Sequence, residues 1–188
     1  MPRPAYPIET ARLLLRPFTM DDLDALHAIQ SRPDVARYLY WEPRSREEVR
    51  EALAARARRT TLDAAGDTLV LAIERRDSGA LIGDVNLRWL SAAHRQGEIG
   101  FVLHPDYHGR GYGREAAMEM LRLGFGWLGL HRIIGRCDAR NDASARLMER
   151  LGMRREAHFR QNEVFKGAWG DEYVYALLAA EWAANNGL

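Results

Sequence analysis

Residues 104–116 have the sequence HPDYHGRGYGREA and lie between an alternating apolar segment, residues 98–103, and a segment with helical spacing, residues 115–121. Three alternate glycines let the backbone adopt unusual dihedral angles and approach a ligand closely. A strand, a glycine-rich turn and a helix start are typical of a phosphate site, because the first helical amides and the helix dipole favour an anion. Arg110 and Arg114 add guanidinium groups that can grip phosphate oxygens. The stretch therefore predicts a binding site for a pyrophosphate at residues 104–116, which we call the cradle.

Two other nucleotide-binding motifs fit this stretch less well. A Walker A loop needs the pattern G-x-x-x-x-G-K-[ST], and the chain has no such pattern. The dinucleotide fingerprint G-x-G-x-x-G/A is met by Gly111, Gly113 and Ala116, but it should close the first strand of a βαβ unit and precede an acidic residue about twenty positions later. Here it lies past the middle of the chain, and residues 128–132 are LGLHR. An ordinary glycine-rich turn is the remaining alternative.

The composition is that of a soluble globular protein. The 188 residues suit one domain, and 47% of them are hydrophobic and 28% charged. A net charge of +1 gives no case for a nucleic-acid or membrane surface. The single cysteine, Cys137, favours a reducing compartment, and residues 1–10 lack the apolar core of a signal peptide, so we expect a cytoplasmic protein. The six histidines and one cysteine show no metal-ligand spacing, so we expect no metal.

Apolar periodicity and breakers predict about seven strands and about four helices. Thr19 and Asn141 are typical N-caps, residues 45–48 (SREE) form a capping box, and Gly152 stands where a helix C-cap belongs. We expect strands at residues 12–17, 68–74, 81–89, 98–103, 132–139, 153–164 and 172–178, and helices at residues 19–29, 45–59, 115–121 and 141–151, with fraying at 124–129. The order is β-α-α-β-β-β-α-β-α-β-β.

This order resembles that of the GNAT superfamily of acyltransferases over nearly the whole chain. The glycine-rich stretch is similar to GNAT motif A, Q/R-x-x-G-x-G/A, with His108 where Gln or Arg is usual. Four other segments resemble the RimJ/RimL-like N-acetyltransferases: residues 10–13 (TARL), 98–101 (EIGF), 141–153 (NDASARLMERLGM) and the C-terminal residues 165–182. The resemblance implies a single GNAT domain over residues 1–188, with a core at about 8–183, in the α/β (α+β) class with a mixed central sheet.

The resemblance also implies that acetyl-CoA is the co-substrate. Motif A would bind its pyrophosphate, and the free amides of the central strand would hold the pantetheine arm and the acetyl carbonyl. The implied cofactor-binding residues are Phe101, Val102, Leu103, His108, Gly109, Arg110, Gly111, Tyr112, Gly113, Arg114, Asn141 and Ser144.

Acyl transfer from a thioester to an amine needs a base for the amine, donors for the oxyanion and sometimes an acid for the leaving thiolate. Glu98 is our first candidate for the base, because relatives place a catalytic carboxylate at this strand; its alternative is a surface carboxylate. His94, His104 and His108 are weaker candidates. For the acid, Met148 stands where many GNAT enzymes have a tyrosine, so Ser144 or an unassisted thiolate would serve.

Two further predictions concern the nucleophile and the acceptor. A lone cysteine in a β segment, such as Cys137, is more often a buried thiol than a nucleophile that forms a covalent intermediate. We therefore expect direct transfer of the acyl group in a ternary complex. Aromatic residues are candidates for the acceptor pocket, with core packing as the alternative: Tyr38, Tyr40, Trp41 and Trp89.

The acceptor would be a primary amine, either a protein N-terminal α-amine or a small molecule such as a polyamine, an amino acid or an aminoglycoside. A longer donor such as succinyl-CoA, a non-catalytic acyl-CoA-binding protein and a nucleotide-binding protein are the alternatives. We expect a monomer or a homodimer.

Overall fold

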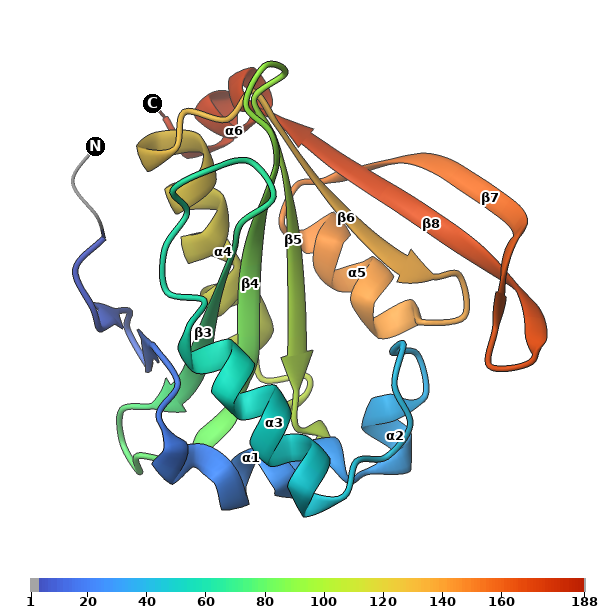
Figure 1. Cartoon of the computed structure of the whole chain (residues 1–188). Coiled ribbons are helices and arrows are strands. Elements are labelled where there is room, and N and C mark those ends of the chain that lie inside the picture. Colours follow the sequence, from blue (N-terminus) through green and yellow to red (C-terminus); the bar gives the residue numbers. More distant parts are fainter. Residues whose placement is uncertain (1–3, 188) are drawn as a thin grey trace.

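A mixed eight-stranded sheet in the order β1-β2-β3-β4-β5-β6-β8-β7 forms the centre of the computed structural model, which describes residues 4–187 (Figure 1). The strands are β1 (Ile8–Glu9), β2 (Leu13–Arg16), β3 (Thr68–Arg75), β4 (Leu81–Ser91), β5 (Gln96–Leu103), β6 (Arg132–Asp138), β7 (Arg154–Phe165) and β8 (Ala168–Leu178). The α-helices are α1 (Leu23–Gln30), α2 (Pro33–Ala36), α3 (Arg46–Ala57), α4 (Tyr112–Arg122), α5 (Asp142–Arg150) and α6 (Ala179–Asn186).

Both faces of the first half of the sheet are covered by helices. Leu69, Leu71 and Ile73 of β3 are fully buried in the main core, which includes α4, whereas Val70 and Ala72 pack with α1 and α3 in a second cluster. Successive side chains of a strand point to opposite faces, so this division follows directly from the alternation. A strand buried on both faces is a continuous apolar run, which explains the sequence TLVLAI of β3.

The one parallel contact of the sheet is also its shortest ladder beyond β1. Strand β5 pairs with β6 only at Gln96, Gly97 and Glu98, opposite residues 132–134. Beyond that point β5 continues to Leu103 while still paired with β4, and the two parallel strands diverge (Figure 1). The edge of β5 that faces β6 is therefore without a strand partner over its last residues.

The predicted fold class and element order are confirmed, with one more strand and two more helices than expected. Strand β1 has only two residues and α2 one turn, and elements this short leave no periodic signal. Helix α6 was not predicted; it begins at the end of β8, where Glu181 accepts a hydrogen bond from the Leu178 amide. The expected fraying after α4 is a π-helical turn, Leu123–Trp127. The predicted domain limits include residues 1–3 and 188, which lie outside the described residues.

A buried ion pair fixes the connection from β2 to α1. The Arg16 guanidinium donates to both carboxylate oxygens of Asp22 at 2.9 and 2.8 Å, and the Thr19 amide donates to Asp22 at 2.8 Å. Burial alone would raise the pKa of the Asp22 carboxyl, but the bonds from Arg16 and Thr19 outweigh it and lower the pKa. Asp22 is therefore ionised and holds the turn that leads into α1.

Replacing Asp22 with Asn should lower the free energy of unfolding at pH 7 by about 2 kcal/mol, because it removes the charge-assisted hydrogen bonds between Asp22 and Arg16 and leaves Arg16 with Glu74, at 2.6 Å, as its remaining partner. Since the folded-state pKa is below the unfolded value, the contribution of Asp22 is present above the unfolded pKa and is lost as the pH falls through the folded pKa. Urea denaturation across this acid range should show the two proteins converging. Asp24→Asn, at an exposed ion pair, is the control and should change little; equal losses in both variants would contradict the assignment.

Candidate functional site

A cavity of about 680 Å³ lies where β5 and β6 separate. Its walls are the second half of β5, the loop from β5 to α4, much of α5, and α2 with the segment that follows it. Of the predicted cofactor residues, all but one line this cavity: Phe101, Val102, Leu103, His108, Gly109, Gly111, Tyr112, Gly113, Arg114, Asn141 and Ser144.

The loop from β5 to α4 has the backbone that a phosphate cradle requires. Gly109 and Gly111 have φ angles of +74° and +82°, in the left-handed region that disfavours other residues. Gly111 is the N-cap of α4, so the free amides of the first helical turn follow it directly. Gly113 serves packing, since a Cβ there would lie 2.8 Å from the Leu103 side chain. The cradle is thus held close to the end of β5.

The loop and α4 are also fixed by side chains that were predicted to bind the cofactor. His108 Nε2 donates to the Leu103 carbonyl at 3.0 Å, because a carbonyl can only accept. Arg114 Nε donates to the Arg150 carbonyl at the end of α5, at 3.1 Å. Arg110 is the predicted residue that does not line the cavity in the part of the chain described; its guanidinium lies 5.9 Å from the Tyr107 ring centroid.

Helix α5 presents its N-terminus to the cavity. The Asn141 side chain accepts a hydrogen bond from the Ser144 amide at 3.2 Å and so caps the helix. Both residues also line the cavity, so the capping role does not exclude a role toward a ligand. Met148, one turn further along, is buried, and its sulfur lies 2.6 Å from where a Cβ at Gly135 would stand.

Glu98 lies beside the cavity as part of a charged group that sequence reasoning missed. Its carboxylate is 3.7 Å from Arg136 of β6, and Arg136 is 3.9 Å from Glu172 of β8. Among the described residues Arg136 lines the cavity, whereas Glu98 and Glu172 do not. Burial raises the pKa of the Glu172 carboxyl, and Arg136 offsets part of this rise. These three residues lie together because of the register in which β5, β6 and β8 pair. A single sequence does not specify that register.

Asn86 is a second cavity residue that was not predicted. It is opposite Gly100 in the β4–β5 ladder, and its amide nitrogen lies 2.7 Å from where a Cβ of Gly100 would stand. The Asn86 amide therefore lies against the Gly100 backbone and lines the cavity. A polar residue between the apolar Val85 and Leu87 was the available signal.

Cys137 lines the cavity, but its thiol is protonated at neutral pH. Burial raises the pKa of Cys137 to about 12, with smaller contributions from Asp138 and Glu172. A protonated thiol is a poor nucleophile. The environment is thus that of a structural cysteine.

The four predicted acceptor residues are distributed over three places. Tyr38 lines the cavity. Tyr40 is exposed, donates to Glu163 and packs edge-on against Phe165 at 5.5 Å, while the Trp41 carbonyl accepts from Lys166 at 3.0 Å. These contacts join the segment after α2 to the tip of the β7–β8 hairpin. The fourth residue, Trp89, packs against the main core at the far end of β5.

Neither metal ligation nor membrane insertion is visible within residues 4–187. No group of three or more His, Cys, Asp or Glu side chains in this range could hold a metal ion. None of its helices is both long and apolar enough to cross a membrane.

Comparison with known proteins agrees with this geometry. The model of the acetyltransferase (GNAT) domain matches residues 12–154. The uncharacterized N-acetyltransferase YnaD of Bacillus subtilis is 35% identical and aligns over 93% of this chain and 98% of its own length. The structure of a GNAT-family acetyltransferase from Bacillus anthracis, 33% identical, superposes with a TM-score of 0.81 over 92% of this chain and 98% of that one.

A more distant structure is that of spermidine N-acetyltransferase from Vibrio cholerae in complex with CoA and spermine. It shares 24% identity and superposes with a TM-score of 0.76 over 92% of this chain and 99% of that one, which shows a common fold. The family model and the close relatives together establish the family: this chain belongs to the GNAT acetyltransferases and is an acyltransferase.

Proposed function

We propose that the chain transfers an acetyl group from acetyl-CoA to a primary amine by direct attack in a ternary complex. The observation that carries the proposal is the cavity that joins the open edge of β5 to the glycine cradle. The family acts with acetyl-CoA, and the Vibrio cholerae structure holds CoA and spermine.

The cradle residues fit a pyrophosphate. The left-handed backbone of Gly109 and Gly111 turns the chain into α4, the amides of the first turn of α4 would donate to phosphate oxygens, and Arg114 supplies positive charge at the cavity wall. The pantetheine arm would then extend along β5, whose peptide groups from Ile99 onward lack a β6 partner. Asn141 and Ser144 would face the thioester end of the arm from the opposite wall.

The chemistry follows from the groups around the diverging strands. Glu98 accepts the proton of the amine, directly or through a water, and the nitrogen lone pair attacks the thioester carbon. Amides of residues 101–103 stabilise the oxyanion. As the C–S bond breaks, the thiolate leaves and takes a proton from Ser144 or from solvent. The raised pKa of Cys137 supports direct transfer over an acyl-cysteine.

The acceptor remains a primary amine of either class, a protein N-terminus or a small molecule, and the spermine complex of the distant relative favours testing polyamines first. Four properties stay sequence-based predictions: membership of the RimJ/RimL-like branch, a cytoplasmic location, a monomeric or homodimeric state, and the domain limits. A succinyl donor is the second candidate function, and a non-catalytic acyl-CoA-binding protein is the third.

A matched pair of glycine variants tests the cradle. Gly109→Ala and Gly79→Ala both place a side chain at a left-handed φ, +74° and +67°, with no atom within 4 Å of the new Cβ. Each should lose about 1 kcal/mol of stability from backbone strain. Saturating CoA at a hundred times its dissociation constant should add roughly 2.7 kcal/mol to the wild type and to Gly79→Ala, seen as a rise in Tm, and much less to Gly109→Ala. Equal ligand stabilisation in all three proteins, or stabilisation by NAD or ATP instead, would count against the cradle.

Replacing Glu98 with Gln should lower kcat by about 10²-fold while leaving CoA binding intact, because it removes the base and no cofactor contact. Thiol release would be followed with spermidine, an amino-acid amide and an N-terminal peptide as acceptors. Glu172→Gln is the comparison, since its carboxylate also neighbours Arg136. If Glu98→Gln kept full activity and Glu172→Gln lost it, the general base would be Glu172 and not Glu98.

Cys137→Ala should keep nearly full activity, because the thiol stays protonated at the pH of the assay. Mass spectrometry of the wild type after incubation with acetyl-CoA alone should show no acetylated enzyme. A stable mass increase of one acetyl group that Cys137→Ala lacks would refute direct transfer.

A further inference from the structure

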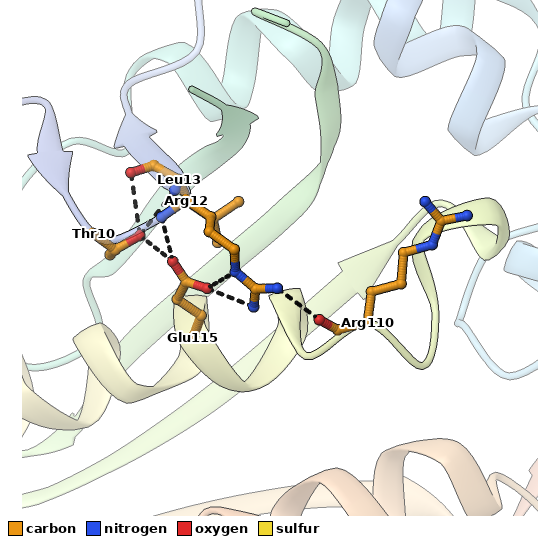
Figure 2. Close-up of polar contacts among 5 residues, drawn as sticks. All are labelled: Thr10, Arg12, Leu13, Arg110 and Glu115. Carbon is orange, nitrogen blue, oxygen red and sulfur yellow. Dashed lines mark hydrogen bonds and ion pairs between the residues drawn. The ribbon is translucent and has the colours of Figure 1, made fainter. Parts of the chain in front are cut away.

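Residues 10–13, which follow β1, lie against the cradle although they are about 100 positions away in sequence (Figure 2). The proposed mechanism uses no residue of this segment. Its sequence, TARL, resembles a segment of the RimJ/RimL-like N-acetyltransferases. Its Arg12 is not among the described residues that line the cavity. Its contacts nevertheless reach the backbone of the cradle itself.

Arg12 joins three parts of the loop and helix. Its Nε donates to Glu115 of α4 at 2.7 Å, its Nη1 donates to the Arg110 carbonyl at 2.9 Å, and its guanidinium carbon lies 4.5 Å from the Tyr112 ring centroid. Its backbone amide also donates to Glu115 at 2.8 Å, and the Thr10 hydroxyl donates to the same oxygen at 2.6 Å. Figure 2 shows Glu115 and the Arg110 carbonyl on the two sides of the one guanidinium.

The bond to the Arg110 carbonyl determines where the next amide points. In a planar trans peptide the C=O of one residue and the N–H of the next are directed to opposite sides. Because Arg12 holds the Arg110 oxygen, the Gly111 N–H points away from Arg12. Gly111 lines the cavity, so the side opposite Arg12 is the side where the anion would bind. A Cβ at Gly111 would lie 3.3 Å from Arg12 Nη2, which shows how closely the guanidinium backs this peptide.

The contact to Glu115 has an electrostatic consequence as well. Burial alone would raise the pKa of the Glu115 carboxyl, but hydrogen bonds from Thr10 and Arg12 lower it, so the group is ionised. It belongs to the first turn of α4, where its charge opposes that of a phosphate at the same helix end. Arg12 places a positive charge 2.7 Å from this carboxylate and compensates it.

We propose that Arg12 is a positioning residue for the pyrophosphate of acyl-CoA: it aims the Gly111 amide into the cavity and neutralises Glu115, without touching the ligand. The inference rests on the proposed binding of CoA at the cradle. It gives a function to the TARL segment, residues 10–13, because Thr10 and Arg12 both hold the Glu115 carboxylate.

The direct test is the amide spectrum of ¹⁵N-labelled protein on addition of CoA. In the wild type the Gly111 amide proton should shift downfield as it bonds to phosphate. In Arg12→Ala this shift should be lost, and calorimetry should show the dissociation constant of CoA raised roughly tenfold, the value expected for one charge-assisted hydrogen bond. Arg12→Lys keeps the charge beside Glu115 but cannot reproduce the planar fork, so it should recover part of the affinity and little of the shift.

The controls separate positioning from stability. Arg46→Ala removes a comparably exposed arginine that holds Asp24 at 2.7 Å and has no contact with Glu115 or the Arg110 carbonyl, and it should bind CoA normally. Adding Glu115→Gln to Arg12→Ala should restore part of the affinity by removing the uncompensated charge. A Gly111 shift in Arg12→Ala equal to that of the wild type would overturn the proposal and leave the proposed function standing. If no cradle amide of the wild type responds to CoA, both fail.

Discussion

The separation of β5 from β6 after three paired residues is the constraint on which the rest of the site depends. A strand edge that loses its neighbour leaves peptide groups that need hydrogen-bond partners. Strand β6 does not supply them, because it diverges from β5 beyond Ile134 and continues to Asp138 paired with β8. The gap is instead walled by α5, whose buried Met148 packs against Gly135 of β6. An extended ligand with amide groups, such as a pantetheine arm, is the natural partner for the exposed edge of β5.

The sequence alone predicted the elements whose signals are local. The capping box at Ser45 is present in the structure, with the Ser45 amide donating to Glu48 at 2.7 Å, and Asn141 caps α5 as expected. The glycine cradle was recognisable because a left-handed backbone needs glycine wherever it occurs. Elements of two to four residues such as β1 and α2 carry too few positions for a period to show, so they were missed.

Predictions that depended on the register of the strands and on the direction of their side chains were less complete. Trp89 was expected in the acceptor pocket, yet it is two positions from the buried Leu87 on β4, and the alternation of a strand puts both on the core face. By the same alternation Asn86 stands on the cavity face, and this signal was available in the sequence. The contacts of Arg136 with Glu98 and Glu172, and of Arg12 with Glu115, join residues that are far apart in the chain. No single sequence specifies such pairs, because they exist only once the strands are in register.

A net charge of +1 conceals a strong separation of charge within the site. Arg114, Arg136, Arg146 and Arg150 line the cavity, whereas Asp34 is the one carboxylate among its described lining residues. Glu98 and Glu172 lie 3.7 and 3.9 Å from Arg136, and Glu163, which accepts a hydrogen bond from the Tyr40 hydroxyl, lies near Glu172. A cavity lined with arginine suits the phosphates of CoA, and carboxylates beside the diverging strands suit an amine that arrives as a cation and must lose a proton. A net charge of +1 therefore gives no case for an extended polyanion surface and says nothing against a local anion site, because a site of this size needs only a few charges on one face.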